Sequence, residues 1–159
     1  MQVIDASSII YAWDNYPENL FPKLWDWIAD EIAHGRLAIP GVAFEEVGHK
    51  IPECAEWLKA HEINRLPGSA SILAEAMRIK GAVGIRDDDY HPKGVGENDL
   101  IIIATALEHG AELISDEQRQ PNPPKEPRRR KIPAVCAMPG VNVQHITFIE
   151  YFKRAGTVF

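Results

Sequence analysis

Short apolar runs alternate along the chain with longer segments whose apolar residues recur at helical spacing. Three such runs predict β-strands, at residues 2–5, 36–40 and 111–116. Apolar residues three or four positions apart predict helices at 20–33, 42–50, 54–61, 69–80 and 97–107. A further helix is expected to begin near Ile9, because Ser7 and Ser8 can cap it directly after the first strand. Strands that alternate with helices predict an α/β fold, a parallel sheet flanked by helices.

The remaining segments are predicted to be loops or short elements. Residues 84–96 are rich in glycine and aspartate, and residues 119–131 are rich in proline and basic side chains. A strand is expected at 132–135, and residues 146–154 fit either a helix or a strand–helix junction. No repeat or linker divides the sequence, so we expect a single domain over residues 1–159.

Length and composition are those of an ordinary globular protein, with 159 residues of which 45% are hydrophobic. No apolar run approaches the roughly 20 residues that a membrane helix needs. The N-terminus reads as a strand, without a basic leader and a long apolar stretch. We therefore expect a cytoplasmic protein, in which Cys54 and Cys136 are reduced and structural.

The net charge of −6 excludes a protein that coats nucleic acid through overall positive potential. It does not exclude a nuclease, because bound metal ions neutralise a local pocket of carboxylates. The sequence contains one basic run, formed by Lys125, Arg128, Arg129, Arg130 and Lys131. This run is either a surface that contacts RNA phosphates or a solvated loop, and the sequence leaves both open.

Four acidic residues stand where the predicted topology places functional sites. Asp5 and Asp116 end the first and third predicted strands, and Asp99 opens the helix at 97–107. Glu46 lies in the helix after the second strand. Singly, each acid could be a helix cap or a solvated charge. Their shared placement at the carboxyl ends of parallel strands predicts a pocket for Mg²⁺ or Mn²⁺, ions that can activate water for phosphodiester hydrolysis.

The same segments resemble the PIN-domain family of ribonucleases. Residues 3–7, Val-Ile-Asp-Ala-Ser, are similar to the family's opening strand and acid, and residues 39–47 to the block that carries its glutamate. Residues 98–116 resemble the most specific stretch, in which an aspartate starts an apolar helix and the next strand ends in Ser-Asp. The resemblance covers residues 1–117. The chain continues through residues 120–159 where typical members end, as in a less-characterised branch of PIN-like proteins.

The resemblance implies a PIN-like fold, a nuclease site that uses Mg²⁺ or Mn²⁺, and kinship with the toxins of bacterial VapC-type toxin–antitoxin pairs. It implies that the metal-binding and catalytic set is Asp5, Glu46, Asp99 and Asp116. Glu46 is preferred to Glu45 because an apolar residue, Val47, follows it as in the family pattern. Ser7 and Ser115 would be hydroxyls that orient the carboxylates or waters.

We therefore expect a metal-dependent endoribonuclease. Its expected partners are an RNA substrate, a second copy in a homodimer and, if the chain is the toxin of a pair, an antitoxin protein. The alternative is an inactive PIN-like module that serves in protein binding or regulation. A phosphatase with an aspartyl nucleophile is disfavoured, because it would need Asp-x-Asp where the chain has Asp5-Ala6-Ser7.

The four tryptophans occupy helical spacings, at Trp13, Trp25, Trp27 and Trp57. This spacing favours a place in the core or in an interface over a role as platforms for base stacking.

Overall fold

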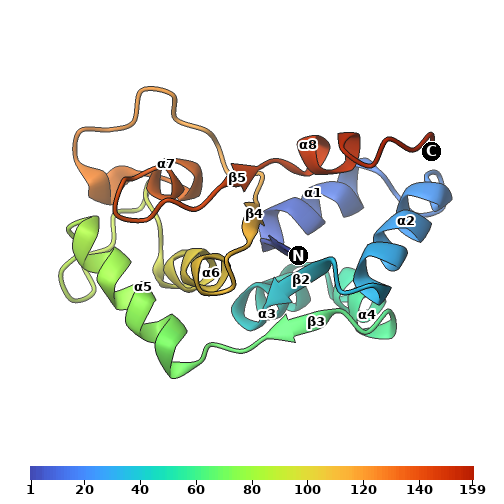
Figure 1. Cartoon of the computed structure of the whole chain (residues 1–159), viewed down its shortest axis with the longest axis horizontal. Helices are drawn as coiled ribbons and strands as arrows, with labels where there is room; N and C mark the ends of the chain where they lie inside the picture. The colour runs from blue at the N-terminus through green and yellow to red at the C-terminus, as the bar shows by residue number, and fades with distance from the viewer.

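A five-stranded parallel sheet forms the centre of the computed structural model, which describes all 159 residues. The strands are β1 (Gln2–Ile4), β2 (Leu37–Pro40), β3 (Asn64–Leu66), β4 (Glu112–Ile114) and β5 (His145–Ile146). Their order across the sheet is β3-β2-β1-β4-β5, and every neighbouring pair is parallel (Figure 1). The predicted α/β fold is confirmed.

Eight α-helices flank the sheet. They are α1 (Ala6–Asn15), α2 (Pro22–Ala33), α3 (Gly41–Lys50), α4 (Pro52–Ala60), α5 (Ala70–Ala82), α6 (Glu97–Glu108), α7 (Ile132–Cys136) and α8 (Phe148–Lys153). In Figure 1, α5 and α7 lie at one end of the molecule and α2 and α4 at the other. None of the helices combines the length and the hydropathy needed to cross a bilayer.

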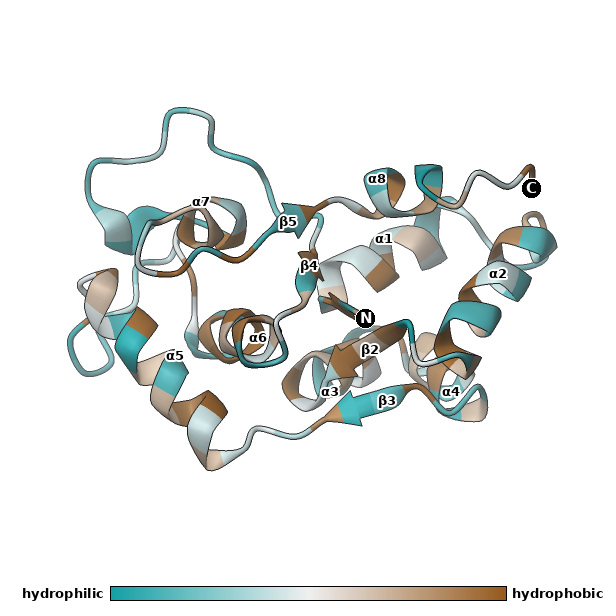
Figure 2. Cartoon of the chain, viewed as in Figure 1, coloured by the Kyte–Doolittle hydropathy of each residue, from teal (hydrophilic) through white to brown (hydrophobic).

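The strands are short but deeply buried, as parallel sheets covered by helices require. Val3 and Ile4 of β1 are fully buried, and all four residues of β2 are buried. The central helix α6 packs on β1, β2 and β4. Its apolar run is buried because it meets the sheet on one side and α5 and α7 on the others (Figure 2).

One hydrophobic cluster of 40 buried residues runs through the molecule, from Val3 near the N-terminus to Tyr151 near the C-terminus. Cys54 and Cys136 are both free and buried within it, which confirms that they are reduced, structural residues. Burial raises the pKa of each thiol to about 12, so neither is a reactive thiolate at neutral pH.

The tryptophans pack into this core or along its margin, as their spacing predicted. Trp25 is fully buried and makes edge-to-face contacts with Trp13 and Trp57, at ring-centroid distances of 5.3 and 4.8 Å. Trp27 packs against Tyr151 of α8 at 5.0 Å. The aromatic side chains therefore join α1, α2, α4 and α8 to one another.

Two elements differ from the sequence prediction. Residues 132–135 form helix α7, so the expected strand is wrong: Pro133 stands in the first turn, where a proline needs no amide donor and its fixed φ suits a helix. Strand β3 lies between the helices predicted at 54–61 and 69–80, where no strand was expected, because two of its three residues, Asn64 and Arg65, are polar and exposed. The C-terminal segment is a strand–helix junction, in which Thr147 caps α8.

Candidate metal centre

The strand order reverses between β1 and β4, and the carboxyl ends of these two strands meet at that point. Asp5 follows β1 directly, and Ser115 begins the segment after β4. Asp99 lies in the first turn of α6, and Glu46 lies within α3, the helix after β2. Open α/β sheets form their sites at such a switch point. The fold therefore brings together acids that are distant in the sequence.

Asp5 is a buried carboxylate, only 3% exposed. Its Oδ1 accepts the backbone N–H of Ala6 at 2.8 Å, which caps α1, and its Oδ2 accepts the hydroxyls of Ser7 at 2.6 Å and Ser115 at 3.1 Å. Burial raises the pKa of Asp5 to about 6, although the Ser7 hydrogen bond opposes the shift. The charges of Asp99 and Glu46 raise it further. Asp5 is both a helix cap and a member of an acidic group.

Asp99 is the second member of this group. Its Oδ2 accepts the backbone N–H of Gly96 at 2.9 Å, which fixes the carboxylate at the start of α6. Burial raises the pKa of Asp99, and the Gly96 N–H opposes that shift. The charges of Glu117 and Glu46 also raise this pKa, and Lys131 lowers it. Asp99 therefore faces two further carboxylates.

Glu46 lies at the edge of the same group, paired with Lys50 one helical turn away. The Lys50 Nζ donates to Glu46 Oε1 at 2.8 Å. This hydrogen bond raises the pKa of Lys50, and the charges of Asp5 and Glu117 add to the effect. Glu45 is exposed and contributes to none of these interactions. The arrangement therefore favours Glu46 over Glu45.

A cavity of about 320 Å³ opens beside these acids. It is lined by Glu46 of α3 and by the start of α6, at Gly96, Glu97, Asn98 and Asp99. No lining residue is hydrophobic, so the space suits a hydrated or charged ligand.

Asp116 lies apart from the acidic group. Its Oδ2 accepts the hydroxyl of Ser8 at 2.6 Å and the backbone N–H of Phe148 at 3.3 Å. The charge of Asp116 is not among the largest causes that shift the pKa of Asp5 or Asp99. In this structure Asp116 joins the end of β4 to α1 and to the start of α8. Its proposed role as a metal ligand stays a prediction, and the arrangement does not favour it.

Glu117 lies near the acidic group, and the sequence analysis did not select it. Its charge raises the pKa of both Asp99 and Lys50. The chain bends after β4: the Ser115 hydroxyl that donates to Asp5 also accepts the backbone N–H of Glu117 at 3.2 Å. The carboxylate of Asp116 turns instead to Ser8. No pattern in the sequence marks this bend.

The serines predicted to orient the carboxylates both contact Asp5. The Ser7 hydroxyl donates to Asp5 and accepts the backbone N–H of Asp116 at 3.0 Å, which links the ends of β1 and β4. The hydroxyls of Ser7 and Ser115 lie 3.3 Å apart. These contacts agree with an orienting role and hold Asp5 in one position.

As the side chains lie, no three His, Cys, Asp or Glu residues come close enough together to hold one metal ion. The Lys50 ammonium draws Glu46 to itself, and hydrogen bonds hold Asp5 and Asp99 to their own backbone turns. The donor set nevertheless fits a hard divalent cation, because all the converging groups are carboxylates whose mutual repulsion a cation would relieve. Side-chain rotation would be needed to close such a site.

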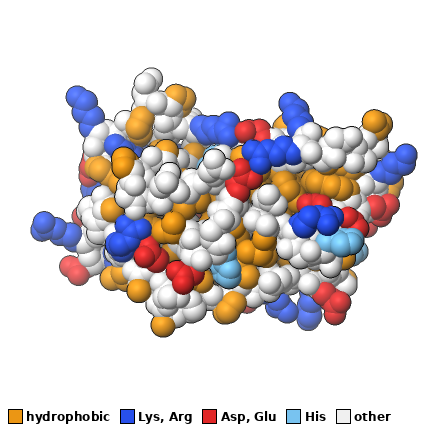
Figure 3. Space-filling view, in the orientation of Figure 1, with side chains coloured by type: hydrophobic (Ala, Val, Ile, Leu, Met, Phe, Trp, Pro, Cys, Tyr) orange, Lys and Arg blue, Asp and Glu red, His pale blue; other side chains and the backbone are white.

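Two of the five basic side chains of the run, those of Arg128 and Arg130, hold loops together. Arg128, which is half-buried, forms an ion pair with Asp89 at 2.7 Å and another with Glu126 at 3.0 Å. Arg130 donates to the carbonyl of Pro124 at 3.1 Å. The acidic and basic side chains in the view of Figure 3 are interspersed, without a continuous basic surface.

The remaining basic side chains of the run, Lys125, Arg129 and Lys131, form no ion pair. The charge of Lys131 lowers the pKa of Asp99. RNA binding by this run stays a prediction.

Residues 2–159 match the family described as a domain of unknown function, DUF4411, and the chain belongs to that family. The match includes the segment that extends beyond the usual PIN pattern. No curated protein sequence matches the chain.

Solved structures share the fold. A crystal structure of VapBC2 from Rickettsia felis, bound to a DNA fragment from its promoter, contains a chain with a TM-score of 0.58 and 14% identity. The similarity covers 92% of this chain and 97% of that chain. A toxin–antitoxin complex from Klebsiella pneumoniae gives a TM-score of 0.53 and 18% identity, over 93% and 98% of the two chains. At these identities the likeness establishes the fold, and the predicted PIN-like architecture is confirmed.

Proposed function

We propose that the chain is a metal-dependent ribonuclease, with Asp5, Glu46, Asp99 and Glu117 as its acidic centre. The observation that carries the proposal is that carboxylates from separate parts of the chain meet at the switch point of the sheet and raise the pKa of two of their members. Unneutralised carboxylates that repel one another are costly, which favours a bound cation. RNA as the substrate is supported by the resemblance of residues 1–117 to PIN-domain ribonucleases, and the fold shared with toxin–antitoxin structures agrees with that resemblance.

The cation proposed here is Mg²⁺ or Mn²⁺, which prefers oxygen ligands and keeps several waters. When bound, such an ion supplies a Lewis acid that lowers the pKa of a water and stabilises negative charge on a phosphodiester. The chain itself supplies position: Ser7 and Ser115 orient Asp5, and the Gly96 N–H orients Asp99. Lys50 adds a positive charge at the rim, where a phosphate backbone can approach.

The direct test is cleavage of end-labelled single-stranded RNA by the purified chain. We expect cleavage with Mg²⁺ or Mn²⁺, none in EDTA, and a loss of about 100-fold or more in Asp99→Asn. Mn²⁺ binding, measured by electron paramagnetic resonance, should weaken in the same variant. A variant that keeps full cleavage and full Mn²⁺ affinity would remove Asp99 from the site.

Two matched pairs separate neighbouring acids. Glu117→Gln and Glu46→Gln should each weaken Mn²⁺ binding by about tenfold or more. Asp116→Asn and Glu45→Gln change the same charge one residue away, and should leave Mn²⁺ affinity within about twofold. If Asp116→Asn weakens Mn²⁺ binding and Glu117→Gln does not, then Asp116 is the metal ligand, as the sequence alone suggested.

A toxin role is the biological setting that we infer, with an antitoxin protein as partner. One similar structure is VapBC2 with promoter DNA, and the other is a toxin–antitoxin complex. Expression of the chain in bacteria should stop growth, Asp99→Asn should not, and the product of a small neighbouring reading frame should restore growth. Light scattering of the purified chain tests the homodimer, which stays a prediction.

The second candidate is a module that binds a partner without cleaving RNA. It is favoured by the Lys50–Glu46 ion pair, since an ammonium already neutralises one of the four acids. Absence of cleavage and of Mn²⁺ binding, together with a stable complex with the neighbouring gene product, would establish this alternative.

A further inference from the structure

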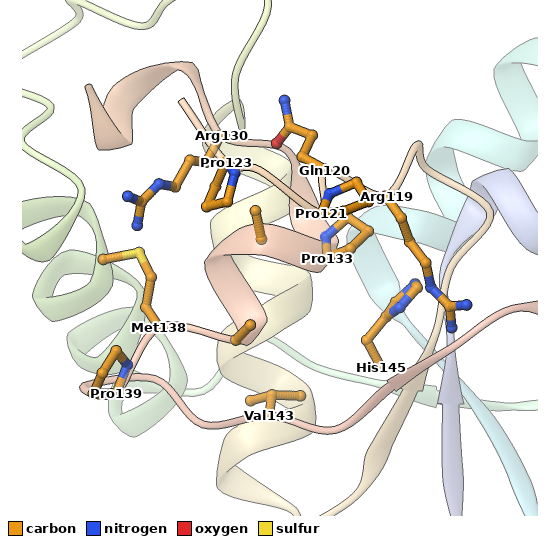
Figure 4. Close-up of a pocket in the computed structure, with 12 residues that line it drawn as sticks. Arg119, Gln120, Pro121, Pro123, Arg130, Pro133, Met138, Pro139, Val143 and His145 are labelled. Atoms are coloured by element: carbon orange, nitrogen blue, oxygen red, sulfur yellow. The ribbon is translucent and has the colours of Figure 1, made fainter. Parts of the chain in front are cut away.

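A second cavity lies beside the acidic centre and not within it. Its volume is about 590 Å³, and every one of its twelve lining residues falls between Arg119 and His145 (Figure 4). The cavity is therefore built entirely from the segment that follows the last acid of the centre. None of the lining residues is acidic, although the chain as a whole carries a net charge of −6.

The cavity has an apolar middle and cationic ends. Pro121 and Pro133 lie above and on helix α7 in Figure 4, and Val143 lies below it. Arg130 lies at one end of the view, and Arg119 lies beside His145 at the other. A ligand that fits this arrangement has a flat apolar body and negative charge on both sides.

Both guanidinium groups retain free donors. Arg130 uses its Nε–H on the carbonyl of Pro124 at 3.1 Å, which fixes the side chain and leaves the terminal nitrogens for a ligand. Arg119 forms an ion pair with Glu150 through one terminal nitrogen, and its side chain is still 50% exposed. Each can therefore donate to a phosphate with little rearrangement.

The cavity is connected to the acidic centre through Ser115. The Nε2–H of His145, on the cavity wall, donates to the backbone carbonyl of Ser115 at 2.8 Å. The hydroxyl of the same serine donates to Asp5 at 3.1 Å. A single residue, Ser115, therefore stands between the cavity wall and the acidic centre, so the two sites are neighbours.

We propose that the cavity binds one nucleotide unit of the RNA strand, with its base on the apolar wall and its flanking phosphates on Arg119 and Arg130. This inference rests on the proposed function and extends it, because it assigns a subsite that selects which bond is cleaved. Phosphate contacts position a strand, and contacts to the base provide selectivity.

The first test uses the four ribonucleoside 5′-monophosphates as probes, in EDTA, with the full-length chain. Titrations followed by ¹H–¹⁵N nuclear magnetic resonance should give saturable shifts confined to α7 and to residues near Val143 and His145. Arg130→Gln should weaken binding by about tenfold, because a charge-assisted contact is lost. Arg86→Gln removes an exposed arginine outside the cavity and should change nothing.

The second variant fills the cavity. Ala134→Phe places a ring among the lining residues and should abolish monophosphate binding while the remaining amide spectrum stays that of the folded chain. Shifts that spread over the whole surface, or that persist in both cavity variants, overturn the subsite.

The outcome can be separated from that of the proposed function. RNA cleavage whose site preference changes in Arg130→Gln but not in Arg86→Gln supports the subsite. Metal-dependent cleavage without monophosphate binding here rejects the subsite and leaves the ribonuclease proposal standing. Monophosphate binding here without any cleavage rejects the ribonuclease and keeps a nucleotide-binding cavity.

Discussion

At the scale of single residues, Asp5 shows how one side chain can stabilise the fold and carry a cost at the same time. It caps α1 and holds the hydroxyls of Ser7 and Ser115, yet it is buried close to Asp99 and Glu46. A pKa raised from 3.8 to about 6 corresponds to about 3 kcal/mol that the ionised form costs the folded state. That cost is the physical mark of a site prepared for a cation.

The sign of the pH dependence follows from this shift. Because the pKa of Asp5 is higher in the folded chain, the folded state binds more protons between pH 4 and 6, and the free energy of unfolding falls as pH rises through that window. The raised pKa of Asp99 acts in the same direction. Urea unfolding without metal should therefore show lower stability at pH 7 than at pH 5 from these two groups.

Asp5→Asn provides the matching variant, since an amide can still accept from Ala6 and donate to the serines. Its stability should change less between pH 5 and 7 than that of the wild type, whereas Asp26→Asn on the exposed face of α2 should keep the wild-type profile. In the wild type, Mg²⁺ should restore stability at pH 7 and have little effect at pH 5. An identical pH profile in wild type and Asp5→Asn would contradict the buried-acid account.

At the scale of elements, the sequence was informative wherever a strong pattern met a single physical requirement. Helix α6 and the strands β1, β2 and β4 are buried, and their hydrophobic runs predict this burial. Strand β3 could not be predicted, because it is polar and its position depends on pairing with β2. The expected strand at 132–135 has strand-forming residues, but Pro133 at its start serves α7 instead.

The acids divide in the same way. Asp5 precedes helix α1 and Asp99 lies in the first turn of helix α6. The sequence pattern predicts where both helices begin, so it also predicts the positions of these two acids. Glu117 and Asp116 are adjacent, and which of them faces the site depends on the direction of the chain after β4 leaves the sheet. Only the contact between Ser115 and Asp5 fixes that direction.

The loops at residues 84–96 and 119–131 contact each other in the structure, although nothing in the sequence pattern predicts this contact. The backbone N–H of Val95 donates to the carbonyl of Arg130 at 2.9 Å, and Gly94 lies so close that a Cβ there would come within 1.9 Å of the Arg128 carbonyl oxygen. The prolines of residues 119–131 therefore belong to a segment held against residues 84–96. This contact sets the entry to α6 and hence the position of Asp99.

Gly94→Ala tests this junction between the loops. The added methyl must push two backbones apart, so we expect a loss of about 2–4 kcal/mol in the free energy of unfolding and weaker Mn²⁺ binding, both measured on the purified variant. Gly81→Ala is the control: it lies within α5, a Cβ there meets nothing within 4 Å, and alanine should stabilise by about 0.5–1 kcal/mol. Equal stability of the two variants would contradict the junction.

At the scale of the whole molecule, buried carboxylates have different partners at the two ends of the sheet. At the carboxyl end, Asp5 and Asp99 remain unpaired with any cationic side chain at hydrogen-bond distance. Near the amino ends of β1 and β2, the buried Glu31 is fully engaged. Its Oε1 accepts the Nε–H of Arg36 at 2.7 Å, and its Oε2 accepts the hydroxyl of Tyr151 at 2.6 Å. One end is arranged for stability and the other for binding.

Tyr151→Phe separates these two roles. Removal of the hydroxyl leaves one oxygen of the buried Glu31 without its partner and loosens α8 from α2, so the free energy of unfolding should fall by about 1–3 kcal/mol. Tyr90→Phe removes a hydroxyl that makes no hydrogen bond within the protein, and should cost less than about 0.5 kcal/mol. Because Tyr151 lies at the end of the sheet opposite the acidic centre, Mn²⁺ affinity per folded molecule should be unchanged in both variants. A Tyr151→Phe protein that unfolds like the wild type but loses Mn²⁺ affinity would mean that α8, through its contact with Asp116, governs the acidic centre after all.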